Sequence, residues 1–220
     1  PAGHPETLLV TAQFDLSRFD ERLYASCQLP SPVHLNRAVR KRRAEYLASR
    51  VVVRYALARM GIEGVILSND PDRAPVWPAG ISGSLSHSHQ RIAVLLSRRE
   101  NRLLSGVDCE QVMRPETAEE MQSRIVTAEE KRKLLESGLP FATALTLAFS
   151  VKESLYKALF PPLRQYMDFS AAEITALFPA TGKVQLRLTT SFSSDFPAGR
   201  EFTGQVELEA DQVLSWVIEG

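Results

Sequence analysis

Near the middle of the chain, the segment Gly106-Val-Asp-Cys-Glu110 ends a stretch that is typical of a β-strand. Side chains alternate along a strand, so Asp108 and Glu110 share one face while Val107 and Cys109 take the other. Two neighbouring carboxylates repel each other unless a cation lies beside them. The acid pair therefore predicts a cation beside it, and the role of that cation is the main question about function.

Before the acid pair, the sequence predicts an edge strand over Thr7–Asp15 and a long helix over Asn36–Gly61, with glycine as its C-terminal stop. A buried strand is expected over Ile92–Leu96. We expect Leu103–Val112 to return beside that strand as the second half of a hairpin, which would deliver the acid pair.

After Pro115 the pattern becomes helical. Thr127-Ala-Glu-Glu130 has the spacing of a capping box and predicts a helix that ends near Gly138. A second helix is expected over Phe141–Phe160, closed by Pro161 and Pro162. Three alternating segments then predict strands, namely Lys183–Thr190, Glu201–Glu209 and Gln212–Ile218.

These elements predict an α+β fold in two halves of α/β type, each of which pairs helix with sheet. The expected boundary separates an N-terminal subdomain (1–104) from a C-terminal subdomain (105–220). A chain of 220 residues has enough material for a sizeable core in this arrangement.

The charge balance excludes some classes of partner. Lys plus Arg and Asp plus Glu both number 26, so no excess field attracts the chain to nucleic acid or to a membrane surface. No apolar run approaches the roughly 18 residues of a membrane-spanning helix, and no signal peptide is visible. With only Cys27 and Cys109, a disulfide framework is not expected, and a reducing cytoplasm is the expected location.

A second acidic position lies in the predicted helix over Phe141–Phe160. Glu153 and Lys157 are four residues apart and therefore share a helix face, which alone describes many surface ion pairs. Together with Asp108 and Glu110, however, Glu153 completes an all-oxygen donor set that suits Mg²⁺. Lys157 beside such a site would supply positive charge for a phosphate.

Other site types find little support in the sequence. Zinc motifs of the C-x-x-C and H-E-x-x-H kinds, the phosphate loop, the dinucleotide fingerprint and the G-x-S-x-G elbow are all absent. His87 and His89 have strand spacing, and a phosphate contact or packing explains them better than a metal. The basic run Arg37–Arg43 is either a solvated helix face or a binding surface, and its pattern leaves both open.

Five motifs, in chain order, give the sequence a family resemblance. They are Lys41-Arg-Arg-Ala-Glu-Tyr-Leu-Ala-Ser-Arg50, Ala74-Pro-Val-Trp-Pro78, Ser84-Leu-Ser-His87, Gly106-Val-Asp-Cys-Glu110, and Ala144-Leu-Thr-Leu-Ala-Phe-Ser150 continuing to Lys157. The chain resembles the phosphopantetheinyl transferases from about Arg37 to Lys157. The resemblance is to the monomeric class that activates nonribosomal peptide and siderophore synthetases, and within it to the enterobactin synthetase branch.

The resemblance implies a reaction and its machinery. The 4′-phosphopantetheine group of coenzyme A would pass to a serine of an apo carrier protein, with release of adenosine 3′,5′-bisphosphate. Asp108, Glu110 and Glu153 would hold Mg²⁺ at the pyrophosphate. Glu153, alone or through a metal-bound water, would accept the serine proton, and Lys157 would steady the pyrophosphate.

It also implies contacts to coenzyme A in a cleft between two similar α/β halves. Ser86 and His87 would meet the 3′-phosphate and ribose end of the cosubstrate. The remaining implied contacts are basic, namely Arg50, Arg73, Lys41 and Arg42. The chain departs from the common pattern at Cys109, where many relatives carry an apolar residue, and on the strand model this thiol points away from the metal.

Two alternatives stay open at this point. One is a Mg²⁺-dependent hydrolase acting on another nucleotide pyrophosphate, and the other is a non-catalytic module that binds coenzyme A or a carrier protein. The leading hypothesis remains a monomeric transferase whose partners are coenzyme A and a carrier protein or carrier domain. The carrier and its pathway, siderophore or other nonribosomal peptide, cannot be read from the sequence.

Overall fold

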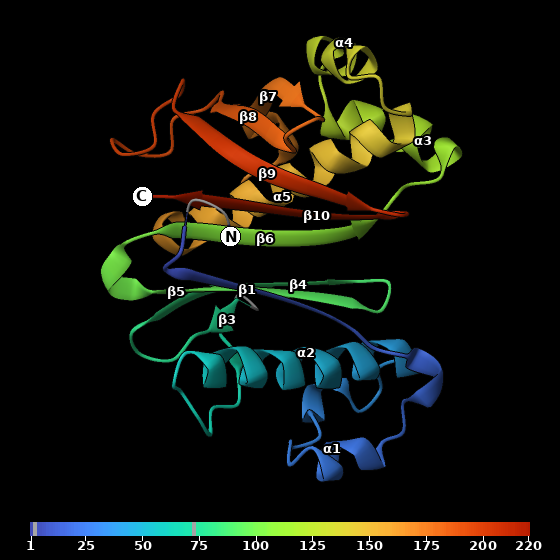
Figure 1. Cartoon of the computed structure of the whole chain (residues 1–220), viewed down its shortest axis with the longest axis vertical. Coiled ribbons are helices and arrows are strands. Elements are labelled where there is room, and N and C mark those ends of the chain that lie inside the picture. The colour runs from blue at the N-terminus through green and yellow to red at the C-terminus, as the bar shows by residue number, and fades with distance from the viewer. Residues whose placement is uncertain (2–3, 72–73) are drawn as a thin grey trace. The chain divides into compact units, whose positions relative to one another are not determined.

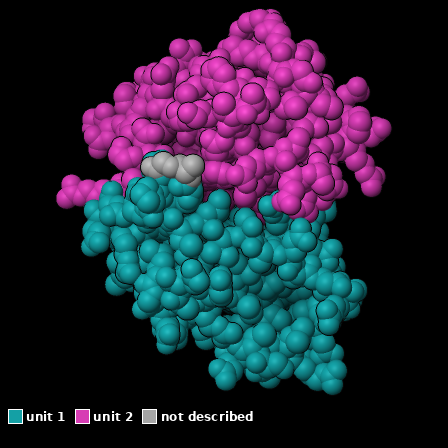
Figure 2. Space-filling view, in the orientation of Figure 1, with its two compact units in different colours: residues 1–101 teal, residues 102–220 magenta. Residues whose placement is uncertain are grey.

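The computed structural model describes residues 1, 4–71 and 74–220 of the chain. These residues form two compact units, unit 1 (Pro1–Asn101) and unit 2 (Arg102–Gly220), which are coloured separately in Figure 2. In the described residues, each unit combines one long helix with an antiparallel sheet (Figure 1). The predicted α+β class is confirmed.

Unit 1 has a three-stranded antiparallel sheet in the order β1-β5-β4, so β1 is an edge strand as predicted. A short two-stranded ladder and a long helix complete its main elements. The bounds are β1 Thr7–Gln13, η1 Leu16–Arg18, α1 Arg22–Ser26, η2 Val33–Leu35, α2 Arg40–Arg59, β2 Ser68–Asn69, β3 Pro75–Val76, β4 Ile81–Ser88, β5 Arg91–Arg98 and η3 Arg99–Asn101.

Helix α2 begins at Arg40, four residues later than the sequence predicted. The preceding residues form the short 3₁₀ turn Val33–Leu35, and Val39 has an extended backbone with no side-chain cap. Asn36 lies in that turn instead of opening the helix. The C-terminal end agrees with the prediction, since Gly61 follows the helix with a positive φ of 78° that favours glycine.

Unit 2 contains a five-stranded antiparallel sheet in the order β6-β10-β9-β8-β7, with α5 across one face (Figure 1). The bounds are β6 Leu104–Gln111, α3 Pro115–Ile125, α4 Ala128–Glu136, α5 Phe141–Leu163, η4 Phe169–Ala171, β7 Ala172–Phe178, β8 Lys183–Leu188, β9 Glu201–Glu209 and β10 Gln212–Glu219. The three predicted C-terminal strands are present, and β7 is an additional strand that the sequence reading missed.

The predicted hairpin is wrong. Strand β5 pairs with β1 and β4, whereas β6 pairs with β10, about a hundred residues later in the chain, with Asp108 opposite Ser215. The prediction assumed that consecutive strands pair with each other. Consecutive strands often do so, but they can also belong to different sheets, as β5 and β6 do here. Arg102, with a left-handed φ of 53°, ends the turn between the two strands.

Helix α5 continues through Pro161 and Pro162 to Leu163, three residues beyond the predicted end. Proline lacks the N–H that would bond to the carbonyl four residues earlier, but it keeps a helical φ. The helix ends at Arg164, which has a left-handed φ of 50° and donates its N–H to the carbonyl of Phe160 (2.8 Å). The two prolines therefore weaken the last turn of α5 but do not end the helix at Phe160.

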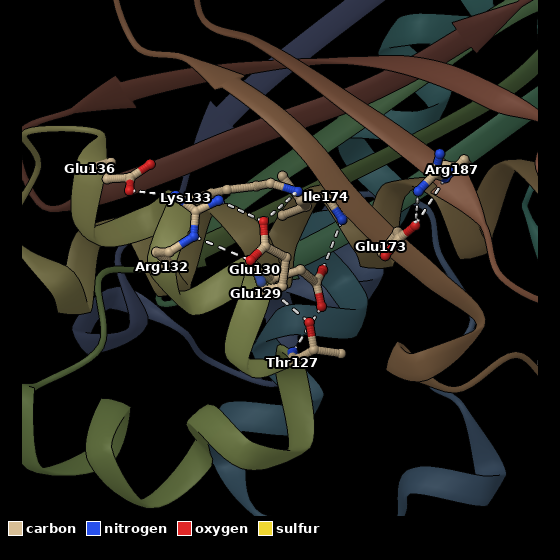
Figure 3. Close-up of polar contacts among 9 residues, drawn as sticks. All are labelled: Thr127, Glu129, Glu130, Arg132, Lys133, Glu136, Glu173, Ile174 and Arg187. Carbon is tan, nitrogen blue, oxygen red and sulfur yellow. Dashed lines mark hydrogen bonds and ion pairs between the residues drawn. The ribbon is translucent and has the colours of Figure 1, made fainter.

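Helix α4 is fixed in place by Glu130, a side chain that is only 2% exposed. The predicted capping box is confirmed, because Glu130 accepts from the Thr127 N–H (2.8 Å) and Thr127 Oγ1 accepts from the Glu130 N–H (3.2 Å). The other oxygen of Glu130 accepts from the Ile174 N–H of β7 (2.8 Å), as Figure 3 shows. The same oxygen pairs with Lys152 of α5 (2.6 Å). One carboxylate thus joins α4, α5 and β7.

Within the described part of the chain, no helix combines the length and apolar character needed to cross a membrane. Cys27 is partly exposed and Cys109 is buried, and the two are not joined in a disulfide.

Candidate active site

Strand β6 brings the two predicted acids against helix α5. A Cβ built on Gly106 would lie 1.9 Å from the carbonyl oxygen of Ser154, so only glycine allows the helix backbone to come this close. Gly106, Asp108 and Glu110 alternate with Val107 and Cys109 and therefore share the face that the helix covers. The strand assignment made from the sequence holds at each of these positions.

Asp108 is buried and bonded to α5 through both carboxylate oxygens. Its Oδ1 lies 2.7 Å from Lys157 Nζ, and its Oδ2 accepts from Ser150 Oγ at 2.9 Å. Lys157 Nζ also donates to the Val107 carbonyl at 3.2 Å, and its side chain stays 26% exposed. The structure thus brings Asp108 and Lys157 together, although they lie 49 residues apart.

A group of hydroxyls supports Asp108, and sequence reasoning missed it. Ser215 on β10 lies 2.8 Å from the hydroxyls of both Ser150 and Ser154. Ser150, Ser154 and Lys157 recur with the spacing of one helix face, which is a signal that the sequence does contain. Ser215 gives no such signal, because only the register of β10 places it opposite Asp108.

Glu153 is half-buried on α5, between the two serines in sequence. Burial raises the pKa of this carboxyl above its usual value, the charge of Asp108 raises it further, and Lys157 opposes both effects. A carboxyl whose ionised form is disfavoured in this way can accept a proton near neutral pH more readily than an ordinary surface glutamate. A cation bound beside Glu153 would also stabilise the ionised form of this carboxyl.

The chemistry of the donor set fits Mg²⁺, because Asp108, Glu110 and Glu153 offer only oxygen. Burial raises the pKa of Glu153 most, and the charge of Asp108 raises it further, so a cation bound here would stabilise the ionised carboxylate. Among the described residues, however, no three His, Cys, Asp or Glu side chains already converge closely enough to hold a metal. Lys157 instead occupies one oxygen of Asp108. The metal ligands therefore remain a prediction.

In unit 1, the predicted coenzyme A contact Arg50 is a buried residue with protein partners. Its guanidinium donates to the Leu67 carbonyl (3.2 Å), to Ser49 Oγ (3.1 Å) and to Asn69 Oδ1 (2.8 Å). It also lies over the Tyr46 ring at 4.1 Å, and burial lowers its pKa. These contacts hold α2 to Leu67 and to Asn69 of β2.

His87 of β4 and Lys41 of α2 meet at a glutamate that the sequence reading had not singled out. His87 Nδ1 lies 3.8 Å from one oxygen of Glu45, and Lys41 Nζ lies 3.9 Å from the other. Adjacent strand residues alternate, so Ser86 lies on the opposite face of β4 from His87. The two predicted neighbours therefore do not point the same way.

Arg42 is exposed on the first turn of α2, and Arg73 lies outside the described residues. The coenzyme A contacts of unit 1 therefore stay predictions.

The family comparisons cover both units. Residues 31–97 match the model described as the 4′-phosphopantetheinyl transferase N-terminal domain, and residues 105–208 match the 4′-phosphopantetheinyl transferase superfamily. Enterobactin synthase component D of Salmonella typhi is 40% identical over 176 residues, which cover 80% of this chain and 70% of that protein. Its counterpart in Salmonella typhimurium is 37% identical over 193 residues (88% and 77%).

A more distant relative, the 4′-phosphopantetheinyl transferase Npt of Nocardia iowensis, is 31% identical over 148 residues, 66% of this chain and 65% of that protein. The second family match includes the four charged residues predicted for the candidate site, Asp108, Glu110, Glu153 and Lys157. The predicted resemblance is confirmed, and the chain belongs to the 4′-phosphopantetheinyl transferase superfamily.

Proposed function

We propose that this protein transfers the 4′-phosphopantetheine group of coenzyme A to a serine of an apo carrier protein, with the candidate site on β6 and α5 as its catalytic centre. Membership of the superfamily makes it an enzyme with coenzyme A as cosubstrate. The observation that carries the assignment of the site is the convergence of Asp108 and Lys157, next to the high-pKa carboxyl of Glu153.

In the proposed reaction, the carrier serine oxygen forms a bond to the pantetheine-side phosphorus of coenzyme A. The bond between that phosphorus and the bridging oxygen of the pyrophosphate breaks, and adenosine 3′,5′-bisphosphate leaves with the electron pair. The serine proton passes to the carboxylate of Glu153, alone or through a water. Lys157 steadies the pyrophosphate, for which its partly exposed ammonium is suited.

Asp108, Glu110 and Glu153 are the proposed ligands of Mg²⁺, which when bound would neutralise charge at the pyrophosphate. Ser150 and Lys157 hold Asp108 in one orientation, so a ligand oxygen is pre-positioned on β6. In unit 1, we propose that Lys41, Arg42, Arg50, Arg73, Ser86 and His87 contact coenzyme A. Within this set, His87 and Lys41 lie close together, because they are 3.8 Å and 3.9 Å from carboxylate oxygens of Glu45.

We further propose that the protein works as a monomer in the cytoplasm. Cys27 and Cys109 are not joined in a disulfide, which agrees with a reducing compartment. The names of the Salmonella relatives support siderophore synthesis as the pathway and a carrier domain of a synthetase as the partner.

The test is incubation with coenzyme A, Mg²⁺ and a panel of apo aryl, peptidyl and acyl carrier proteins, followed by mass spectrometry of each carrier. A phosphopantetheine adduct on the carrier serine is expected, and chelation of the metal should abolish it. No adduct on any carrier would overturn the proposal. Release of phosphopantetheine without a carrier would identify a hydrolase instead, and coenzyme A binding that is indifferent to Mg²⁺, without turnover, would identify a passive binding module.

A further inference from the structure

A cluster of aromatic side chains lies at the C-terminal end of α5. Tyr156 and Phe160 are half-buried, with ring centroids 5.6 Å apart. The ring of Tyr166, from the loop after the helix, lies 6.3 Å from that of Tyr156 and is 80% exposed. The guanidinium of Arg164 lies 5.4 Å from the centre of the Phe160 ring. Tyr156, Phe160, Arg164 and Tyr166 are called the α5 aromatic patch below.

The α5 aromatic patch continues directly from the candidate catalytic residues. Glu153, Tyr156, Lys157 and Phe160 have the spacing of zero, three, four and seven that places side chains on one face of a helix. The pKa of the Tyr156 phenol is raised first by burial and then by the charge of Glu153, which agrees with their proximity. The patch is therefore next to the carboxylate that would accept the serine proton.

The loop that carries Tyr166 is anchored at both ends. On one side, Arg164 closes the helix through its hydrogen bond to the Phe160 carbonyl. On the other side, Met167 is buried, and Asp168 accepts from the backbone N–H (2.9 Å) and hydroxyl (2.6 Å) of Ser170. Tyr166 is thus an exposed ring on a fixed backbone, and a pre-organised aromatic of this kind loses little entropy when a partner covers it.

The proposed reaction decides what must approach this surface. A carrier serine can give its proton to Glu153 only if the folded carrier is brought up to α5, so the exposed surface beside Glu153 has to meet the carrier. We infer that the α5 aromatic patch is the docking surface for the apo carrier protein around its reactive serine, an inference that rests on the proposed function. Tyrosine and arginine are enriched among the residues that dominate such interfaces.

The chemistry of the patch specifies the complementary surface. Tyr166, Tyr156 and Phe160 fit apolar side chains, while the exposed Arg164 favours acidic ones. The matching carrier surface therefore combines apolar and acidic residues beside the serine.

The test uses steady-state transfer by the full-length protein, with separate KM values for coenzyme A and for a carrier that the wild type modifies. Tyr166→Ala is expected to raise KM for the carrier about tenfold, the effect of losing an interface anchor. It should leave KM for coenzyme A, and kcat at saturating carrier, unchanged. Tyr166→Phe keeps the ring and should retain the wild-type KM.

Phe178→Ala is the matched control, because Phe178 is also exposed (49%) but lies on β7, at the opposite edge of the sheet from β6. This control should not alter either KM. Active Tyr166→Ala with an unchanged carrier KM would overturn the docking inference and leave the proposed function standing. A rise in KM for coenzyme A alone would assign the patch to the cosubstrate and overturn the inference too. If the wild-type protein modified no carrier, both the proposed function and the docking inference would be overturned.

Discussion

Two ion pairs are built on helix α5, five residues apart, and they differ in almost every physical respect. The structural pair, Glu130–Lys152, has side chains that are 2% and 3% exposed. Lys152 Nζ also donates to the carbonyls of Ile125 (2.8 Å) and Phe169 (3.1 Å), so all three of its donors have acceptors. The site pair, Asp108–Lys157, leaves the lysine 26% exposed beside a second carboxyl, Glu153.

The difference shows that burial and the number of bonded partners distinguish a structural ion pair from one that could bind a substrate. Burial lowers the pKa of Lys152, and the pair is retained only because every polar atom of the lysine head is bonded. At the site pair, burial raises the pKa of Glu153, the charge of Asp108 raises it further, and Lys157 opposes both effects. The proposed phosphate and cation would therefore meet partly exposed charges at the site pair, whereas the charges of the structural pair are buried and already bonded.

The largest effect is expected at the site pair, on activity. Glu153→Gln removes the proposed base and a proposed ligand, so the rate of carrier modification should fall by about 100-fold or more. Stability should be kept or slightly increased, because a carboxyl disfavoured by burial and by Asp108 is replaced with a neutral side chain. Transfer rates and thermal melting measure the two effects.

Glu129→Gln is the matched control for this change, since Glu129 lies in an exposed ion pair with Arg132 on α4. The control should transfer at the wild-type rate. Near-normal turnover by Glu153→Gln would remove Glu153 from the mechanism. Glu110 is also a proposed metal ligand, so a loss of similar size is expected for Glu110→Ala.

The structural pair should respond in stability instead. Lys152→Met leaves the buried carboxylate of Glu130 without its counter-ion, and the free energy of unfolding should fall by about 3–5 kcal/mol. Chemical denaturation measures this value. In the double variant Lys152→Met/Glu130→Gln, the buried charge is gone and much of the loss should be recovered. A single variant as stable as the wild type would show that the pair does not hold α4 to α5.

A third prediction concerns the distance between β6 and α5. Gly106→Ala places a Cβ against the Ser154 carbonyl and the backbone of Ala158, so the helix must shift away from the strand. We expect the free energy of unfolding to fall by about 3 kcal/mol, the upper end of typical overpacking costs. The transfer rate should also fall, because Lys157 moves with the helix. Unchanged stability and rate would mean that α5 can relax without cost.

The smallest effect is expected among the serines. Ser150→Ala removes one hydrogen bond to the Asp108 carboxylate, and the free energy of unfolding should fall by about 1.5 kcal/mol. Ser154→Ala is the control, because Ser154 bonds to Ser215 and not to the carboxylate, and it should cost about 1 kcal/mol or less. Equal losses in the two variants would show that the charge of Asp108 adds nothing to its bond with Ser150.

Local patterns in the sequence were enough to predict those elements that depend on interactions between residues close in the chain. The capping box of Thr127 and Glu130 predicted the start of α4, because both partners lie within one turn. The alternation around Asp108 predicted which residues share a face of β6. The five ordered motifs indicated the family, because a family resemblance depends on residue type and order.

Tertiary structure alone decided the contacts that join distant segments. The pairing of β6 with β10, the position of Ser215 beside Asp108 and the burial of Arg50 beneath Leu67 and Asn69 depend on register and packing between segments far apart. Lys152 and Lys157 lie on the same helix, and only Lys157, four residues after Glu153, has a role predicted from the sequence. Packing made one a saturated interior ion pair and left the other partly exposed at the acids of β6, because exposure and the number of available partners are set only when the helix meets its neighbours.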